Sequence, residues 1–357
     1  MKHVLFTLCL FSLFLSTAAF ANQLPAQMEG MGIFTFKGSV LPAASKEAAR
    51  KYANEIKVKG FAYVMIKSHD GGSWGTVVNG KWVPCFSEDL VDAFHAEGMR
   101  VYSYYTARLT NDTSITESVR LAARTLDMGA DGMIIDDLGL FGVSTEKWEM
   151  VFRLLRKEVD ARSDKILMSS TFPHLMNLNK KLWGIAFQYS DYFLPQAYWM
   201  QFEAFENGKR VIMQPQNALS YAQDQFDSIR ARYPKSRCRL IPIGRTYGEQ
   251  TDAASVKKFT ETAARFYKGA GLFVLEMEPK KGGWAAIKDA VAAFNPGHGY
   301  KTNSCFDITN GPCRDVPDEP ILVKPSTEEK KGRTKKTEPD DTYHAPSGSD
   351  RSWPVKL

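Results

Sequence analysis

The feature that most constrains this chain is a regular alternation between short apolar runs and longer amphipathic segments. The apolar runs are 32–36, 61–67, 100–105, 129–139, 165–170, 192–198, 239–244 and 271–276. The intervening segments carry apolar residues at helical spacing, as Ala49, Ala53 and Ile56 do. Eight strand–helix units predict an α/β fold, a single closed (β/α)8 TIM barrel. A doubly wound open sheet is the alternative, but no glycine-rich phosphate loop follows the first run.

The first 21 residues have the pattern of a secretory signal peptide. A positive start at Lys2 and His3 is followed by the apolar stretch 4–15 and by the A-x-A site Ala19-Phe20-Ala21. No second long apolar run follows, so we expect no transmembrane segment. The pattern predicts a secreted or periplasmic protein whose barrel occupies residues 22–296.

Four cysteines remain once the signal peptide is set aside. They are Cys85, Cys238, Cys305 and Cys313, and three pairings are possible. A short Asn-Gly-Pro turn separates Cys305 from Cys313, which favours a disulfide between them in an extension over 297–317. Cys85 and Cys238 would form the second disulfide or remain buried thiols.

The last segment, 318–357, is polar and of mixed charge, with hardly any apolar residue before Trp353. Such a composition cannot bury enough surface to fold, so we predict a disordered tail. Its basic cluster comprises Lys330, Lys331, Arg333, Lys335 and Lys336. The tail could contact an anionic surface electrostatically or be inert. The net charge of +6 is mild, and we expect no nucleic-acid partner.

Two adjacent acids, Asp136 and Asp137, end the fourth apolar run. Catalytic groups of barrel enzymes lie at the C-terminal ends of the strands. Side chains alternate along a strand, so one acid faces the barrel axis, and we assign that place to Asp136, with Asp137 second. The alternative is that the two acids cap the turn that follows.

A second carboxylate, Glu276, emerges from the apolar run of the eighth strand. Two carboxylates across a barrel mouth are what glycoside hydrolysis requires, one as the proton donor and the other as the nucleophile or base. Asp136, Glu276 and Asp137 are therefore the predicted catalytic residues. An ion pair of Glu276 with Lys67 or Arg245 is the structural alternative.

Other polar and aromatic residues at the strand ends suit a carbohydrate. The predicted substrate-binding set is Lys67, Asp70, Trp74, Trp82, Tyr104, Gln196, Tyr198, Trp199, Arg245 and Tyr247. Residues 76–83 read as a hairpin on an Asn-Gly turn, which would place Trp74 and Trp82 above the mouth. Each aromatic residue could equally be core packing.

Three short motifs resemble those of the TIM-barrel glycoside hydrolase superfamily, and in particular of family-25 lysozyme-like barrels. They are Lys67-Ser68-His69-Asp70-Gly71, the Asp136-Asp137 pair, and Pro195-Gln196-Ala197-Tyr198-Trp199. The resemblance covers about residues 30–295. It departs at strand four, where the lysozyme-like barrels carry Asp-x-Glu and this chain has Asp136-Asp137-Leu138. That departure puts a lysozyme activity in doubt.

The sequence thus predicts an exported glycosidase that cleaves a polysaccharide or cell-wall glycan by paired-carboxylate catalysis. The alternative is a barrel that binds glycan without cleaving it, or that has a structural role in the cell envelope. We expect a monomer with a carbohydrate substrate. The cysteine spacings do not resemble a zinc site, and the first strand lacks the His-x-His of metal-dependent barrel hydrolases, so no metal or cofactor is expected.

Overall fold

The fold is described from a computed structural model of the chain. The structure describes residues 27–35, 37–40, 42–107, 111–136, 144–173, 180–199, 203–206, 209–212, 214–248 and 251–294. The signal-peptide, 305–313 disulfide and tail predictions lie outside these residues.

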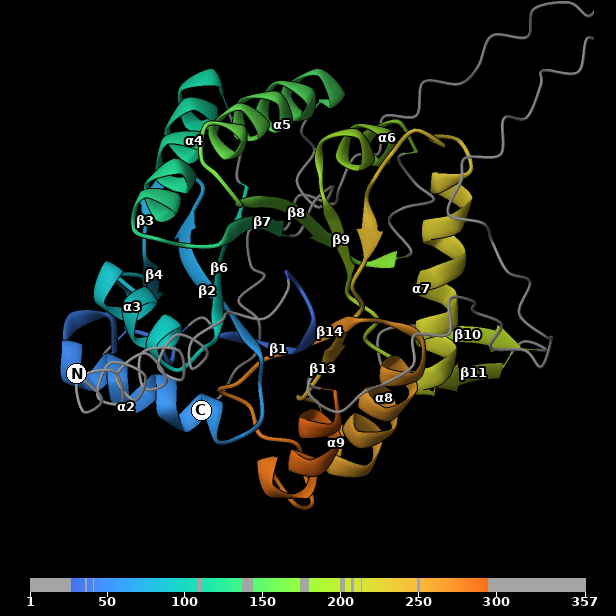
Figure 1. Cartoon of the computed structure of the whole chain (residues 1–357). Helices are drawn as coiled ribbons and strands as arrows, with labels where there is room; N and C mark the ends of the chain where they lie inside the picture. Colours follow the sequence, from blue (N-terminus) through green and yellow to red (C-terminus); the bar gives the residue numbers. More distant parts are fainter. Residues whose placement is uncertain are drawn as a thin grey trace, which may run out of the picture.

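The fold is a mixed α/β architecture in which helices surround a curled parallel sheet (Figure 1). The strands of the sheet are β1 (Gly30–Thr35), β2 (Tyr63–Asp70), β6 (Arg100–Thr106), β7 (Gly132–Asp136), β8 (Ile166–Thr171), β9 (Tyr192–Pro195), β12 (Arg239–Leu240), β13 (Ile243–Arg245) and β14 (Gly269–Phe273), and the short β3 (Ser73–Trp74) pairs antiparallel with β2. Two hairpins lie off the sheet, formed by β4 (Thr76–Val78) with β5 (Lys81–Val83), as predicted, and by β10 (Glu203–Glu206) with β11 (Lys209–Ile212), which was not predicted.

Each predicted amphipathic segment contains a helix. The helices are α2 (Lys46–Lys57), α3 (Glu88–Ala96), α4 (Asp112–Asp127), α5 (Thr145–Asp160), α6 (Lys180–Tyr189), α7 (Pro215–Arg230), α8 (Ala253–Phe266) and α9 (Lys288–Ala293), with the short 3-10 helices η1 (Pro42–Ala44) and η3 (Trp284–Ala286). Ser45, Ser87 and Ser144 cap α2, α3 and α5, each accepting a hydrogen bond from a backbone N–H of the first turn.

The seventh strand differs from the prediction of one continuous run over 239–244. β12 pairs with β9, whereas β13 pairs with β14 on the other side. Pro242 lies between the two pieces and has no N–H to donate to a neighbouring strand. The two ends of the sheet are therefore connected through one short segment of chain, and a bridge between Gln196 and Ile243 adds to this connection.

Two apolar layers pack on the two sides of the sheet. The inner layer holds Phe34, Met65, Tyr104, Ile134, Met168, Leu194 and Ile243, and the outer layer, which packs on the helices, holds Ile33, Ile66, Tyr105, Ile135, Leu167 and Phe193. Residues alternate between the layers along each strand, as the pleat requires. The inner layer is filled by large rings. The ring of Tyr63 lies where a side chain on Gly32 would be, so this position needs glycine.

Cys85 and Cys238 are both buried free thiols, so the disulfide proposed for this pair is wrong. Burial raises the pKa of the Cys85 thiol to about 12. The thiol Sγ lies 2.7 Å from the backbone oxygen of Lys67. The second interpretation of these cysteines, as buried thiols, is the correct one.

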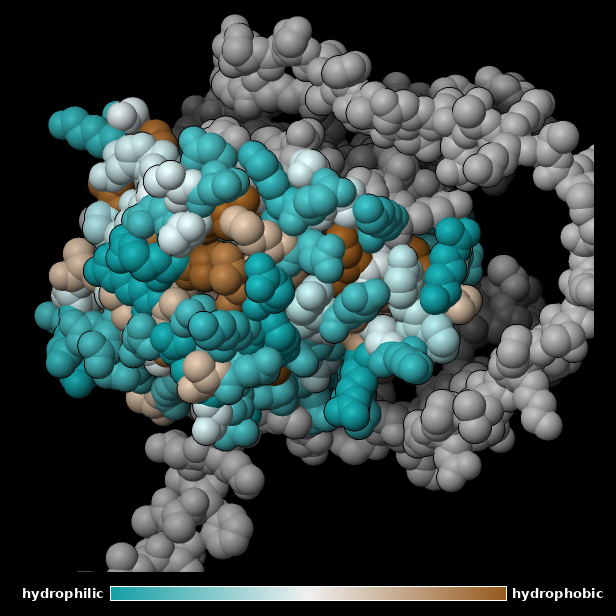
Figure 2. Space-filling view, turned by 90° about the horizontal axis from the view of Figure 1, so that it is seen from above, coloured by the Kyte–Doolittle hydropathy of each residue, from teal (hydrophilic) through white to brown (hydrophobic). Residues whose placement is uncertain are grey.

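The face of the molecule shown in Figure 2 carries mainly hydrophilic residues around a smaller gathering of hydrophobic ones. Among the described residues, the large hydrophobic side chains that are exposed are Val58, Val77 and Trp82. In the same part of the chain, no helix combines the length and apolar character needed to span a membrane.

Candidate functional site

A bulge in β2 determines which of its polar residues face the inside of the sheet. The pairing of β2 with β6 shifts between Lys67 and His69, so Ser68 is an extra residue. Lys67 pairs with Tyr104 before the shift, and Asp70 pairs with Thr106 after it. Because Tyr104 belongs to the inner layer, both Lys67 and Asp70 face inwards. Their side chains form an ion pair, with Nζ 3.3 Å from Oδ2.

The same bulge turns His69 to the outer side of the sheet. Its ring stacks on Tyr105 of the outer layer at a centroid distance of 4.2 Å and is fully buried. Its Nδ1 lies 2.8 Å from Ser68 Oγ. Burial lowers the pKa of His69 to about 3, so the ring is neutral at ordinary pH and packs the sheet against its helices.

Two acids lie in one row across three neighbouring strands. Asp70 of β2 pairs with Thr106 of β6, and Thr106 pairs with Asp136 of β7. Neighbouring strands are about 4.8 Å apart, so the backbones of the two acids are separated by roughly 10 Å. Both side chains face inwards from strands separated by one neighbour, and glycosidases hold their two carboxyl groups about 5 to 9.5 Å apart.

Asp136 shares the inner face of β7 with Ile134 and is 6% exposed. Its Oδ1 accepts a hydrogen bond of 2.9 Å from Nε2 of Gln196, the residue after β9. The same nitrogen lies 3.2 Å from Ser170 Oγ of β8. Three successive strands thus place a carboxylate, a hydroxyl and an amide together at the C-terminal edge of the sheet. Asp137 lies outside the described residues.

Glu276 lies in a turn, because β14 begins at Gly269 and ends at Phe273, earlier than predicted. The alternation used to orient Glu276 therefore does not reach it. Its Oε1 accepts hydrogen bonds from Thr35 Oγ1 at 2.8 Å and from the backbone N–H groups of Lys37 at 2.8 Å and Gly38 at 2.6 Å. These contacts tie the turn after β14 to the end of β1. These three donors are two amides and a hydroxyl, and none of them is the side chain of Lys67 or Arg245, the partners in the predicted alternative.

A cation and several aromatic rings form the opposite part of the inner edge. Arg245 is buried, its Nε donates to the backbone oxygen of Tyr247 at 2.6 Å, and its guanidinium carbon lies 4.5 Å from the centre of the Tyr247 ring. Burial lowers the pKa of Arg245 from its ordinary value. The Tyr198 ring lies 6.3 Å from that of Tyr247, and Tyr104 contacts Phe34 edge-on at 5.1 Å.

Two of the predicted sugar-stacking tryptophans have structural positions instead. Trp199 is 2% exposed and stacks on Phe259 of α8 at 5.6 Å, so it packs the outer layer. Trp74 is half-buried, and its ring lies parallel to that of His69. The guanidinium carbon of Arg124 lies 4.4 Å from the centre of the Trp74 ring. Neither therefore offers an open ring face to a sugar.

Trp82 has the exposure expected of a sugar platform. It is 48% exposed, and Val77, which is 43% exposed, lies directly opposite it on the β4–β5 hairpin. Cross-strand neighbours share one face of a hairpin. The pair therefore forms a small apolar surface on the loop that follows β2.

Thr106 and Ser170 are part of this site and were not among the predicted site residues. The signal for Thr106 is weak because a hydroxyl at a strand end is common. Among the described residues, no group of three or more His, Cys, Asp or Glu is placed to hold a metal ion.

No protein-family model and no curated protein matches the chain. Solved structures do match in fold. The endo-β-1,4-mannanase from Thermotoga petrophila aligns with a TM-score of 0.51 at 8% identity, over 77% of this chain and 78% of the mannanase. The spore cortex-lytic enzyme SleL from Bacillus megaterium QM B1551 aligns at 0.49 and 10% identity, over 76% of each chain. The catalytic domain of a family GH18 chitinase from the fern Peteris ryukyuensis aligns at 0.48 and 12%, over 74% of this chain and 98% of that domain.

At this level of identity the matches establish the fold alone. The curled parallel sheet with its surrounding helices is similar in fold to the barrel of the mannanase structure. Its chemistry must therefore be argued from its own residues.

Proposed function

We propose that this chain is an exported glycoside hydrolase with a complete (β/α)8 barrel, which cleaves a polysaccharide or cell-wall glycan. The observation that carries the proposal is the inward row of Asp70, Thr106 and Asp136 at the C-terminal edge of the sheet. This is the edge at which barrel enzymes hold their catalytic groups. Two carboxylates at this spacing can divide the roles of proton donor and of nucleophile or base.

Asp136 is the first catalytic carboxylate in this proposal. Gln196 donates a hydrogen bond to its Oδ1 and fixes the orientation of the group. A carboxylate held in this way keeps its second oxygen in a defined position toward a bound sugar. Asp137 remains the neighbouring candidate, as predicted.

The second carboxylate is Asp70 or Glu276. Asp70 lies in the same row as Asp136 and faces the same interior. Glu276 has one oxygen occupied by three donors from the end of β1, which favours a role in holding two loops together. We therefore place Asp70 ahead of Glu276.

The substrate would lie along the inner edge, between the Lys67–Asp70 pair and the Arg245–Tyr247 pair. Gln196, Tyr104 and Tyr198 supply polar tips and ring edges there, and Trp82 supplies an apolar face. Flat apolar surfaces with a few fixed polar groups are typical of ligand sites. The signal-peptide pattern supports export to a place where such glycans occur.

The test is release of reducing ends from a panel of polysaccharides by the full chain. Asp136→Asn should abolish release and leave the melting temperature nearly unchanged, because the amide can still accept from Gln196. Full activity of that variant on a substrate that the wild type cleaves would refute the assignment.

The second candidate function, a barrel that binds glycan without cleaving it, is favoured by one observation. Asp70 forms an ion pair with Lys67, both side chains being 14% exposed, and an acid engaged in this way can serve structure alone. This candidate predicts that the wild type retains a glycan but releases no reducing ends.

A further inference from the structure

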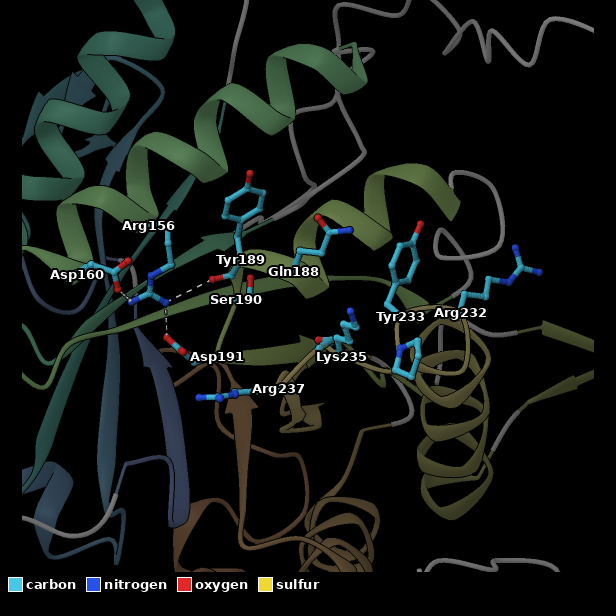
Figure 3. A pocket seen from close by; sticks show the side chains of 12 residues that line it. Arg156, Asp160, Gln188, Tyr189, Ser190, Asp191, Arg232, Tyr233, Lys235 and Arg237 are labelled. Carbon is cyan, nitrogen blue, oxygen red and sulfur yellow. Dashed lines mark hydrogen bonds and ion pairs between the residues drawn. The ribbon is translucent and has the colours of Figure 1, made fainter. Parts of the chain in front are cut away.

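A pocket of about 760 Å³ lies at the other end of the sheet from Asp136. Its walls are the end of α5, the turn between α6 and β9, and the loop between α7 and β12 (Figure 3). Asp191 immediately precedes β9 and lines the pocket, whereas Gln196 follows β9 and contacts Asp136. A strand rises about 3.3 Å per residue, so the two sites are at least ~15 Å apart.

The loop between α7 and β12 is strongly basic. The segment 230–239 contains five Arg or Lys and no acid. Arg232, Lys235 and Arg237 line the pocket and are exposed. Within the described part of the chain, these three side chains form no ion pair. Their charges are therefore available to a ligand.

Arg156 on the facing wall has a different role. It is held by Asp191 at 2.8 Å and by Asp160 at 2.9 Å, and it donates to the backbone oxygen of Tyr189 (Figure 3). This one arginine is thereby paired with both acids that line the pocket, and the three side chains together carry a net charge of −1. The three cations of the basic loop bring the net charge of the pocket lining to +2.

The basic loop is fixed on the protein before any ligand binds. The Tyr233 ring packs on Gly184 of α6, where a side chain would overlap the ring. Ser236 Oγ donates to the backbone oxygen of Phe187 at 2.5 Å and accepts from the Cys238 N–H at 3.1 Å. A loop anchored in this way loses little conformational entropy on binding.

The pocket combines cations with aromatic and polar groups. Tyr189 and Tyr233 are half-buried and offer ring surface and hydroxyls, and Gln188 adds an exposed amide. Cations, ring surfaces and uncharged donors in one concave site fit a chain of sugars that carries carboxylates. A nucleic acid would instead require a longer basic track along its phosphates.

We propose that this pocket binds an anionic glycan, one that carries uronic acid carboxylates, and holds the polymer to the enzyme away from the catalytic row. The choice of a glycan rests on the proposed function; the choice of an anionic one rests on the pocket alone. Because the two sites lie at opposite ends of the sheet, binding here does not depend on cleavage there.

The experiment measures binding of the full chain to a sized oligogalacturonate and to its fully methyl-esterified, uncharged form. Wild type should bind the charged form at least ~tenfold more tightly, with an affinity that falls as salt rises. The variant Arg232→Gln, Lys235→Gln, Arg237→Gln should lose at least ~tenfold in affinity for the charged form. The three side chains are exposed and unpaired in the described chain, so the fold should persist.

A matched variant controls for the loss of positive charge. Arg50→Gln, Lys51→Gln, Lys258→Gln removes three exposed cations on α2 and α8 and should bind as the wild type does. Asp136→Asn should also bind normally, which separates this proposal from the catalytic one. Equal binding of both sugar forms, or unchanged binding by the pocket variant, would overturn the proposal.

Two further probes identify other anionic ligands. A single-stranded DNA oligonucleotide of equal charge and vesicles containing phosphatidylglycerol should bind more weakly than the oligogalacturonate. Tighter binding of either probe, lost in the pocket variant, would assign the pocket to that class of partner and reject the glycan.

Discussion

Asp131 and Asp136 lie at the two ends of the β7 region and have opposite surroundings. Asp131 directly precedes the strand. Its carboxylate accepts hydrogen bonds from the Val101 N–H at 2.8 Å and from Arg100 at 3.1 Å, and it lies 2.9 Å from His95 Nε2. Asp136 ends the strand on the inner face, where Gln196 donates to one oxygen. The first acid is enclosed by an arginine, a histidine and a backbone amide, and the second accepts from a neutral amide side chain.

The same contrast appears on the neighbouring strands. Asp191, before β9, binds Arg156 and the Leu167 N–H, whereas the inner residues at the C-terminal ends of the strands include Asp70 and Asp136. Acids at the start of the strands therefore serve the structure, and the acids at the end of the strands are the ones that we propose for catalysis. This is the usual division of labour in barrels.

The largest effect should come from Asp136. Asp136→Asn should lower the rate of reducing-end release by ~10³-fold or more, because an amide cannot donate or accept a catalytic proton. Urea unfolding should show a change below about 1 kcal/mol, since the amide retains the contact with Gln196. A large loss of stability with activity unchanged would reverse the roles assigned to the two ends of β7.

Asp131→Ala should produce the opposite pattern. Removing this buried acid leaves Arg100 and the Val101 N–H without their acceptor, at a cost of about 3 kcal/mol in the free energy of unfolding. Cleavage by the fraction that remains folded should match the wild type. Urea denaturation and an activity assay corrected for the folded fraction provide the check.

The contribution of Asp131 should also depend on pH. Burial opposes its ionisation, but the hydrogen bonds from His95 and Val101 and the charge of Arg100 outweigh burial, so the pKa of Asp131 lies below its ordinary value. The stabilisation is therefore complete above about pH 4, the unfolded value, and is lost as the pH falls through the lower folded value. The difference in stability between wild type and Asp131→Ala should narrow on acidification; a constant difference would contradict this.

A smaller effect distinguishes the two candidates for the second acid. Asp70→Asn should slow cleavage by ~10²-fold, whereas Glu276→Gln should change it by less than ~10-fold, because the Gln oxygen can still accept from Thr35, Lys37 and Gly38. The reverse order would restore Glu276 as the partner of Asp136. Initial rates on one confirmed substrate are sufficient.

His69 provides the smallest effect. Its pKa is lowered to about 3 by burial, so the unfolded chain takes up a proton near pH 6.5 that the folded chain does not. The free energy of unfolding should therefore fall by about 1.4 kcal/mol per pH unit below that value, or by about 2 kcal/mol between pH 6.5 and 5. Wild type should show this slope in excess of His69→Gln; equal slopes would mean that His69 is accessible to protons.

Hydrophobic periodicity predicted the order of strands and helices. It could not predict the bulge at Ser68, because an extra residue leaves the apolar pattern of β2 unchanged up to Lys67. That the side chains of both Lys67 and Asp70 face inwards therefore follows only from the strand pairing. Nor could it place Glu276, since alternation carries no information beyond the end of a strand.

The burial of Trp199 emerges from the structure and not from strand alternation, because β9 ends at Pro195. Tyr198 belongs to the inner layer, whereas Ala197 and Trp199 belong to the outer layer, toward α8. Aromatic residues near a strand end were read as sugar platforms because composition alone cannot distinguish the two sides of a sheet. The ring of Phe259 on α8, on which Trp199 stacks, shows that Trp199 lies on the outer side.

The pairing of β1 with β14 has a consequence for how the chain folds during synthesis. β1 is buried along its whole length and pairs on one side with β2 and on the other with β14, which is the last strand of the described chain. During synthesis, the edge of β1 that pairs with β14 therefore stays unpaired until residues 269–273 have left the ribosome. An unpaired strand edge is a site of aggregation. Chains that end before Gly269 should therefore accumulate as insoluble protein, because β14 is not there to pair with this edge of β1.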